Sequence, residues 1–376
     1  MKGTDLLLYE RKRRRPGGLS IGIIGGLSEG KFRSKIKPLV CLENVGKVYL
    51  FRYNGNCLKE YEKVKVLRYF ELVKVPRRLF DLIYIFYFTY LCMLGKLDML
   101  VGIYFFPHGM FAGILGLIFK VPVVQVTTGT DLKKLTKGAF SALLNSGKHV
   151  GVRGEISKAE LIKLGINEQK IFILNNFAKK NKTQAMTHSV EKKYDLIYVG
   201  YLRPLKRLDI LLNVVKRLKE NIPCIKCLIV GDGPSKSDLL EMRKKNGIED
   251  NVIFTGHVNN VDSYLETSKI FIMTSESEGL PMAMIEAMSW GLPVVVPNIN
   301  DIPTIAKHGE SGFLINSTMV DDYYNHCRTL LTDHGLRARM GHSSASAIQE
   351  LYKHSFSFEA VSKVWAGVLG ENEPRQ

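Results

Sequence analysis

The sequence predicts an α/β protein made of two doubly wound domains that face each other across a cleft. Short apolar runs alternate with helical patterns along the whole chain, which is typical of parallel sheets joined by crossover helices. The chain has 376 residues, enough for two such domains. Residues 177–193 are polar and lack an apolar period, so they predict the linker.

Twelve strands are expected, six in each domain. In the first domain they are 20–24, 47–51, 98–104, 121–126, 149–152 and 170–174. In the second they are 195–200, 224–230, 252–254, 269–273, 293–296 and 312–315. Residues 358–369 are amphipathic and predict the last helix. The expected parts are therefore a first domain at 1–180, a second at 181–355, and a C-terminal helical segment at 356–376.

The positive charge of the chain lies in its first half. The net charge is +17 overall. Residues 1–180 carry 31 Lys and Arg against 13 Asp and Glu, a balance of +18, whereas residues 181–376 carry 22 against 23, a balance of −1. This asymmetry indicates an anionic partner for the first domain. A nucleic acid is not favoured, because no zinc-finger, RNA-recognition or helix-turn-helix signature accompanies the charge.

An uncharged segment at residues 82–95 contains five aromatic residues. Its 14 residues fall short of the roughly 20 needed to span a bilayer. Two interpretations remain open: a buried helix before the next strand, or a helix in the membrane interface flanked by Arg77, Arg78 and Lys96. The basic run at 11–15 is either a solvated arm or a further contact with lipid phosphates.

The chain is expected in the cytoplasm, peripherally associated with the membrane. The apolar run at residues 6–9 is too short for the core of an export signal, and the six Cys therefore need not pair. Cys224 and Cys227 have the spacing of metal ligands, but no second pair accompanies them, so no metal site is expected there.

The most informative stretch is 274–297, where seven residues separate Glu278 from Glu286. Gly279 permits a turn with positive φ, and Pro281 suits the first turn of a helix. A helix N-terminus after a strand is a ready anion site. Carboxylates beside an anion site can accept hydrogen bonds from hydroxyl groups of a ligand whose phosphate occupies that site. A ligand with both a phosphate and several hydroxyl groups is typically a nucleotide sugar.

This stretch resembles the EX7E region of glycosyltransferase family 4, whose members are retaining enzymes with the GT-B fold of two Rossmann-like domains. Four further blocks follow the family order and spacing, at 199–206, 230–234, 252–256 and 309–313. The resemblance implies a nucleotide-diphosphate sugar as donor, transfer with retention, and no cofactor. The chain contains no Asp-x-Asp motif, which indicates transfer without a metal ion.

The resemblance also implies roles for residues of the donor side. Glu278 lies near the transferred sugar, Glu286 binds the ribose hydroxyls, and Lys206 binds the diphosphate, so that Glu278 and Lys206 are candidate catalytic residues. The other candidate donor contacts are Gly200, Gly231, Gly279 and Leu280. Where relatives carry an Arg after the first of these glycines this chain has Tyr201. Two expectations stay open: either Arg203 or Arg207 replaces that Arg, or the chain holds its donor more weakly.

The candidate acceptor residues lie in the first domain. Gly25 and Gly26 follow the first predicted strand, as the glycine-rich acceptor loop does in GT-B enzymes. His108 follows the third strand and is the candidate catalytic histidine. Many relatives have a His where this chain has Thr128, so Thr128 or Asp131 is expected to take that contact.

The leading interpretation is a transferase that acts on a lipid-linked saccharide or polysaccharide, docked on an anionic membrane through its basic first domain. Two alternatives stay open. One is a soluble glycosyltransferase for a small molecule or a glucan, and the other is a catalytically silent subunit that binds sugar nucleotides.

Overall fold

The chain forms two compact α/β units, described here from a computed structural model. The structure describes residues 17–28, 30, 32–54, 61–67, 77–132, 134–135, 138–176 and 190–370, without the side chains of 26–28, 51–54, 66–67, 77–84 and 129–130. Unit 1 comprises residues 1–178 and 355–376, and unit 2 comprises residues 179–354. The basic run at 11–15, the side chains of Arg77 and Arg78, and residues 177–189 of the predicted linker lie outside the described residues.

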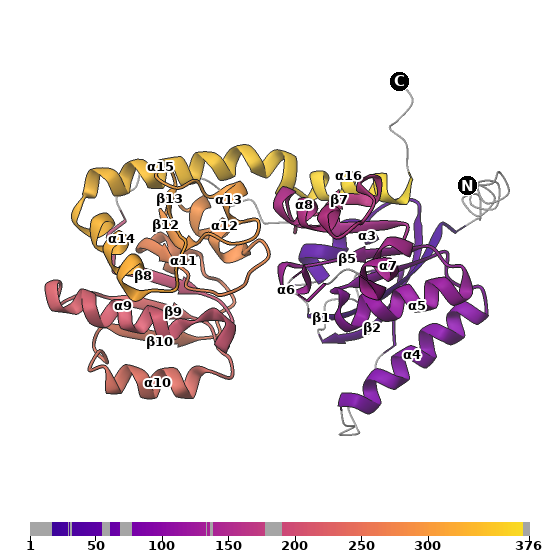
Figure 1. Cartoon of the computed structure of the whole chain (residues 1–376), viewed down its shortest axis with the longest axis horizontal. Helices are drawn as coiled ribbons and strands as arrows, with labels where there is room; N and C mark the ends of the chain where they lie inside the picture. Colours follow the sequence, from indigo (N-terminus) through magenta and orange to yellow (C-terminus); the bar gives the residue numbers. More distant parts are fainter. Residues whose placement is uncertain are drawn as a thin grey trace. The chain divides into compact units, whose positions relative to one another are not determined.

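Unit 1 is built on a parallel sheet with the strand order β3-β2-β1-β4-β5-β6-β7 (Figure 1). Its described strands are β1 (Leu19–Ser28), β2 (Val45–Asn54), β3 (Val64–Leu67), β4 (Met99–Ile103), β5 (Val123–Val126), β6 (His149–Val152) and β7 (Ile171–Ile173). Its helical segments are η1 (Phe32–Ile36), α3 (Lys37–Val40), α4 (Arg77–Met93), η3 (Phe105–Gly109), α5 (Met110–Phe119), α6 (Gly129–Leu132), α7 (Ala139–Ser146), α8 (Glu155–Lys163), η4 (Glu168–Lys170) and α16 (Phe358–Leu369).

Unit 2 repeats the same plan with the strand order β10-β9-β8-β11-β12-β13. The described strands are β8 (Tyr194–Val199), β9 (Cys227–Val230), β10 (Val252–Gly256), β11 (Ser268–Ile272), β12 (Val294–Pro297) and β13 (Gly312–Ile315). The described helices are η5 (Pro204–Lys206), α9 (Leu208–Asn221), α10 (Lys236–Lys245), α11 (Asp262–Glu266), α12 (Met282–Ser289), α13 (Ile302–Ile305), α14 (Val320–Thr332) and α15 (His334–Leu351), and η6 (Tyr352–Phe356) follows at the boundary with unit 1. Central strands such as β9 are buried throughout because helices cover both faces of a parallel sheet.

The strand order places a ligand crevice in each unit. In both sheets the order reverses beside the first strand, between β1 and β4 in unit 1 and between β8 and β11 in unit 2. Doubly wound sheets bind ligands outside the carboxyl ends of the strands at such a switch point. The segments that follow these four strands are therefore expected to line the ligand sites.

One strand was missed by the sequence prediction. The edge strand β3 (Val64–Leu67) pairs with β2 in parallel, so unit 1 has one strand more than the six expected. The strand is four residues long and contains Lys65 between its valines, and Val64 is buried whereas Lys65 is exposed. A short edge strand with one covered face lacks the continuous apolar run by which the other strands are recognised.

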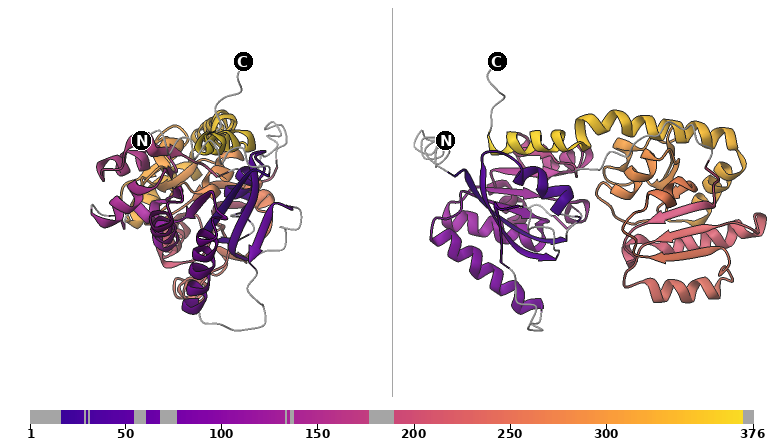
Figure 2. Two further views of the ribbon diagram at one scale, coloured as in Figure 1. Left: turned by 90° about the vertical axis from the view of Figure 1, so that its right-hand side faces the viewer. Right: turned by 180° about the vertical axis from the view of Figure 1, so that it is seen from behind.

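The C-terminal helix α16 packs in unit 1, where it lies beside α3 (Figures 1 and 2). Trp365 is fully buried there, and its indole N–H donates to the backbone carbonyl of Lys35 at 3.3 Å. The Trp365 ring also lies 6.3 Å from that of Phe172 in β7. This large aromatic side chain joins the first and last parts of the chain in one core.

Helix α4 is neither fully buried nor fully exposed. Among its described side chains Phe88, Leu91 and Cys92 are buried, whereas the apolar residues Phe86 and Tyr90 are exposed. The prediction of a buried helix is therefore wrong for one of its faces. None of the helices in the described part of the chain is both long and apolar enough to cross a membrane.

Candidate active site

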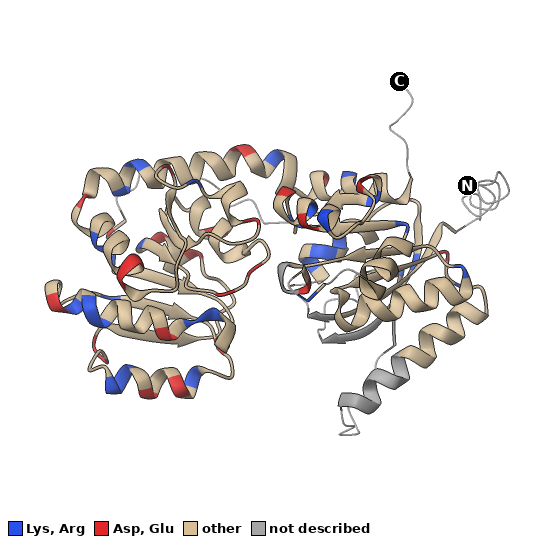
Figure 3. Cartoon of the chain, in the orientation of Figure 1, with Lys and Arg blue, Asp and Glu red and all other residues tan. Residues whose placement is uncertain are grey.

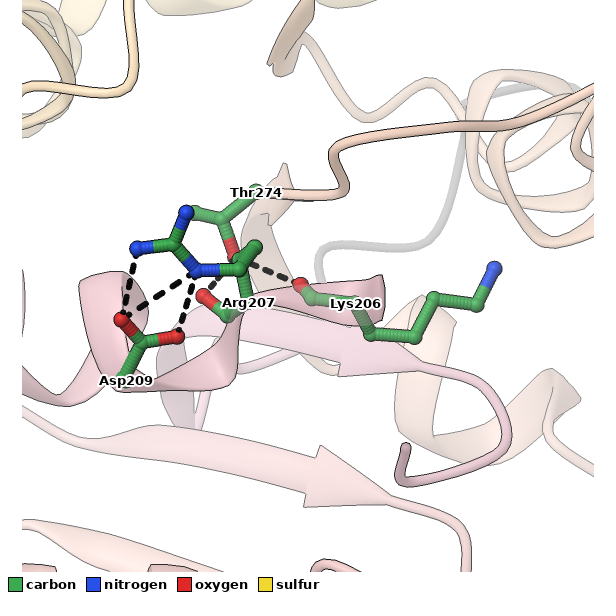
Figure 4. Close-up of polar contacts among 4 residues, drawn as sticks. All are labelled: Lys206, Arg207, Asp209 and Thr274. Atoms are coloured by element: carbon green, nitrogen blue, oxygen red, sulfur yellow. Dashed lines mark hydrogen bonds and ion pairs between the residues drawn. The ribbon is translucent and has the colours of Figure 1, made fainter. Parts of the chain in front are cut away.

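Two loops meet at the switch point of unit 2, one after β8 and one after β11. The backbone N–H of Glu276 donates to the carbonyl of Leu205 at 3.0 Å. The hydroxyl of Thr274 donates to the carbonyls of Lys206 and Arg207, at 3.1 and 2.8 Å (Figure 4). These bonds fix η5 against the start of the EX7E segment.

The two loops bring Lys206 and Glu278 into a direct ion pair. The ammonium of Lys206 donates to Oε1 of Glu278, across 72 positions of the sequence. Their side chains are only 15% and 10% exposed, so water screens the pair weakly. The two candidate catalytic residues of the donor side are thus side by side. The carboxylate of Glu278 thus holds the cation that the resemblance assigns to the diphosphate.

The neighbouring cations differ in their surroundings. Arg207 pairs with Asp209 at 3.0 Å, and Figure 4 shows the Lys206 side chain extending away from this pair. The guanidinium of Arg203 lies 5.8 Å from the ring centre of Tyr201, the residue that stands where relatives have Arg. Of the two candidates to replace that Arg, Arg207 is therefore paired with a carboxylate, whereas Arg203 lies beside the Tyr201 ring.

Glycines allow a close approach of two backbones beside this pair. Gly231 has φ +140°, and a Cβ there would lie 1.9 Å from the carbonyl oxygen of Gly200. A Cβ on Gly200 would lie 2.6 Å from the hydroxyl of Tyr198. Only glycine fits at either position. Both glycines follow the ends of neighbouring strands, which opens space at the carboxyl edge of the sheet.

Several buried hydroxyl groups occur at the end of β8 and in the loop after β11, and they were not anticipated from the sequence. Those of Tyr198, Ser275 and Ser277 have no hydrogen-bond partner among the described residues. Burial raises the pKa of Tyr198, and the carboxylate of Glu278 raises it further. Asn300 (φ +47°) was also missed, and its side-chain amide donates to the backbone carbonyl of Glu278. The alternation of Ser with Glu over 275–278 is the sequence signal that could have revealed the two serines.

Glu286 occupies the fifth position of α12. Burial, and then the carboxylate of Asp262, raises the pKa of Glu286 to about 7. The helix begins at Met282 with Pro281 as its N-cap. No hydrogen bond of the described residues takes up the backbone N–H groups of Gly279 and Leu280. Two donors and a half-buried carboxylate therefore lie within one short segment.

The expected positive φ at Gly279 is wrong. The described glycines with positive φ include Gly231 and Gly291 but not Gly279. The chain enters α12 through Pro281, which has an extended backbone (φ −76°, ψ 113°). An extended entry of this kind needs no left-handed residue.

The raised pKa of Glu286 predicts a pH-dependent stability. Its pKa in the folded protein lies above the ordinary value of 4.5, so the stability it contributes is present below pH 4.5 and is lost as the pH rises through about 7. Between pH 5 and pH 8 the free energy of unfolding of the wild type should therefore fall by about 2 to 3 kcal/mol relative to that of Glu286→Gln. Urea unfolding at both pH values measures this difference. Glu276→Gln removes an exposed carboxylate of the same loop and should behave as the wild type, whereas equal pH dependence in all three proteins would contradict the assignment.

The candidate acceptor residues of unit 1 are arranged differently from the prediction. Gly25 and Gly26 lie inside β1 and not after it, where the pairing of β1 with β2 shifts register between Ile24 and Leu27. Gly25 is required there by packing, because a Cβ would come within 2.9 Å of the Ile103 side chain in β4. The strand continues past the glycines because β2 offers ten residues for pairing.

The loops after β4 and β5 are joined through Asp131. Its carboxylate accepts from the backbone N–H and the hydroxyl of Thr128, at 2.9 and 3.0 Å, and from the N–H of Phe106 at 3.4 Å. His108 lies in the same segment as Phe106, in η3. Asp131 is buried and thereby holds the segment of His108 against that of Thr128. Among the residues that the structure describes, no group of three His, Cys, Asp or Glu is arranged to hold a metal ion.

Residues 179–346 match the family described as glycosyl transferases group 1. The match covers unit 2, which is similar to the group 1 glycosyltransferases. The matched residues span the whole of the site in unit 2, and the resemblance carried by the EX7E segment is confirmed.

Curated relatives of this chain align over different parts of their lengths. An uncharacterized glycosyltransferase of Haemophilus influenzae is 30% identical over 52% of this chain and 53% of its own, so the chain spans about half of that relative. The N-acetyl-alpha-D-glucosaminyl L-malate synthase of Bacillus anthracis is 24% identical over 74% of this chain and 77% of its own. An Escherichia coli UDP-Gal:alpha-D-GlcNAc-diphosphoundecaprenol alpha-1,3-galactosyltransferase is 34% identical over 34% of each chain.

Solved structures of the same fold match nearly the whole chain. Anabaena HepE, solved in complex with UDP-glucose, matches with a TM-score of 0.70 over 94% of this chain and 100% of its own, at 15% identity. The two doubly wound units therefore form the GT-B fold that the sequence predicts.

Proposed function

We propose that this chain transfers a sugar from a nucleotide-diphosphate sugar to a lipid-linked saccharide or polysaccharide, at the cytoplasmic face of a membrane and with retention at the anomeric carbon. One observation carries the proposal: Lys206, Glu278 and Glu286 come from the loops and helix at the switch point of unit 2, beside the unused N–H groups of Gly279 and Leu280. Cation, N–H donors and carboxylates together suit a diphosphate joined to two sugars.

In this proposal, donor binding replaces the ion pair between Lys206 and Glu278 by contacts of each side chain with the donor. The diphosphate takes the ammonium of Lys206, which releases the carboxylate of Glu278 to the hydroxyls of the transferred sugar. Glu286 accepts from the ribose hydroxyls, and Gly279 and Leu280 donate to phosphate oxygens. The glycines Gly200 and Gly231 leave room for the nucleotide, and Arg203 supplies the second cation.

Transfer then proceeds without a metal ion. The bond between the anomeric carbon and the phosphate oxygen breaks while the acceptor oxygen bonds to the same face of that carbon. The departing phosphate oxygen takes the acceptor proton. Lys206 and the two N–H groups stabilise the charge that develops on the diphosphate, and preorganised stabilisation of this kind usually contributes more to catalysis than any other single effect.

The acceptor binds unit 1 in this proposal. Gly25, Gly26, His108 and Thr128 belong to segments near the switch point of its sheet. The diphosphoundecaprenol acceptor of the Escherichia coli relative, and the excess positive charge of residues 1–180, support a lipid-linked anionic acceptor and a membrane partner. The L-malate synthase relative supports the alternative of a small soluble acceptor.

A panel of nucleotide sugars tests the donor assignment. We expect one UDP-sugar or a related nucleotide sugar to raise the melting temperature, since a ligand at 100 times its Kd stabilises a protein by roughly 2.7 kcal/mol. Slow hydrolysis of that donor without acceptor would argue against a silent subunit. If no nucleotide sugar stabilises the protein or is hydrolysed, the proposal fails. Transfer to a diphosphoprenol saccharide, compared with small alcohols and acids, distinguishes the two acceptor classes.

A further inference from the structure

The surface of unit 1 formed by α4 and α5 is unusually apolar. Helix α5 contains no polar side chain at all, with the sequence MFAGILGLIF. A helix that is apolar on all sides normally lies in a protein core or in a membrane. Yet Leu117 and Ile118 of α5 are 59% and 65% exposed. Phe86 and Met93 of α4 are 71% and 70% exposed.

Both helices bury one face on the same side of the sheet. Phe88 and Leu91 of α4 and Ala112 and Leu115 of α5 belong to one buried cluster with side chains of β1, β4 and β5. Helices α4 and α5 pack against each other, and we call their exposed apolar residues together the α4–α5 surface. It comprises Phe86, Tyr90, Met93, Leu94, Ile114, Leu117 and Ile118.

This concentration distinguishes the surface from ordinary exposed apolar residues. The other large apolar side chains that are exposed in the described part of the chain are scattered over both units, at Ile156, Ile162, Val190, Tyr201, Ile253 and Met319. Figure 3 shows α4, where described, and α5 without charged residues along their lengths. Contiguous apolar surface of this kind marks an interaction site.

The charges at the edge of the surface are basic. Among the side chains described in this region, Lys96 and Lys120 are exposed, whereas Asp98 is buried and accepts from the N–H of Ser20. Each lysine follows a helix that leads into β4 or β5, and these strands are parallel neighbours. Both lysines therefore lie toward the edge of the sheet where the strands begin, on one side of the surface. Lysines at the border of an apolar face can reach lipid phosphates while the face enters the bilayer.

We propose that the α4–α5 surface docks this glycosyltransferase on an anionic lipid bilayer. The inference rests on the proposed function in that a lipid-linked acceptor requires a membrane-bound enzyme. A second copy of the chain is a poorer occupant, because it would bring together two chains that each carry a net charge of +17. An anionic membrane instead attracts each basic residue near its surface.

Co-sedimentation with vesicles tests the proposal with a matched control. The test variant is Leu117→Asp/Ile118→Asp, and the control is Met319→Asp, whose side chain in unit 2 is also 65% exposed. We expect the wild type and the control to bind vesicles of phosphatidylglycerol and phosphatidylethanolamine, and the test variant to bind at least about tenfold more weakly. Lys96→Glu/Lys120→Glu should weaken binding less and reduce its salt dependence.

The outcomes separate docking from catalysis. Donor-induced thermal stabilisation and donor hydrolysis, measured without lipid, should be the same in the test variant as in the wild type. If those assays fail in the wild type while vesicle binding holds, the proposed function fails and the docking surface stands. Equal vesicle binding by all variants, equal loss in the Met319→Asp control, or a wild-type dimer that the test variant abolishes would overturn the docking surface.

Discussion

Replacing Lys206 by Ala is expected to lower kcat/KM for sugar transfer by about 10³-fold, because in the proposed function its ammonium is the cation that faces the departing diphosphate. Most of the loss should fall on kcat, since charge on the leaving group is larger in the transition state than in the bound donor. Initial rates over a range of donor concentrations, on protein whose circular dichroism matches the wild type, measure both constants.

The control for this variant is the next residue along the chain. Arg207→Asn removes a cation whose guanidinium already binds Asp209, and Asn tolerates the left-handed backbone of that position (φ 50°). We expect it to change kcat/KM less than about tenfold. Equal losses in the two variants would show that general positive charge near the donor matters, and would contradict a specific role for Lys206.

Glu286→Ala should abolish measurable transfer by removing the acceptor for the ribose hydroxyls. Hydrogen bonds to a charged group contribute roughly 1.5–3 kcal/mol each, so the loss of two predicts a decrease in donor affinity of about 10²-fold or more. The ionised carboxylate accepts a hydrogen bond from each of the two ribose hydroxyls, whereas the protonated carboxyl group has an O–H that must itself donate. Because the pKa of Glu286 is about 7, donor affinity should fall as the pH drops below 7.

A comparison of donors isolates this contact. Calorimetric titration of the wild type at pH 6 and pH 8 should show tighter donor binding at pH 8, and weaker binding of a donor that lacks the ribose 2′-hydroxyl. Glu286→Gln should flatten the pH dependence and lose the discrimination between the two donors. Full activity in Glu286→Ala would rule out its assignment to the donor site.

Regular elements were predictable wherever local pattern and tertiary context agree. The predicted helix at 358–369 and the strands at 149–152 and 312–315 match α16, β6 and β13 to the residue. Their apolar periods are strong and their ends carry turn signals. Strand β3 was missed because a half-covered edge strand has too short a pattern. Gly25 and Gly26 were misplaced because a pair of glycines marks a loop and an irregular strand equally well.

The candidate donor site was predictable in its membership but not in its contacts. Motif spacing pointed to Lys206, Glu278 and Glu286, yet no local pattern indicates that Lys206 and Glu278 pair across 72 positions. Tyr198 was missed because a Tyr in a predicted strand is usually a core residue. Only the structure shows that its hydroxyl lies next to Gly200. The choice between Arg203 and Arg207 likewise depended on the three-dimensional neighbours Tyr201 and Asp209.

A crystal structure of the chain with an intact nucleotide sugar tests the central claim most directly. We expect the diphosphate on Lys206 and on the N–H groups of Gly279 and Leu280, the ribose hydroxyls on Glu286, and the Lys206–Glu278 ion pair opened. A donor bound elsewhere in the chain, with that ion pair intact, would contradict the account.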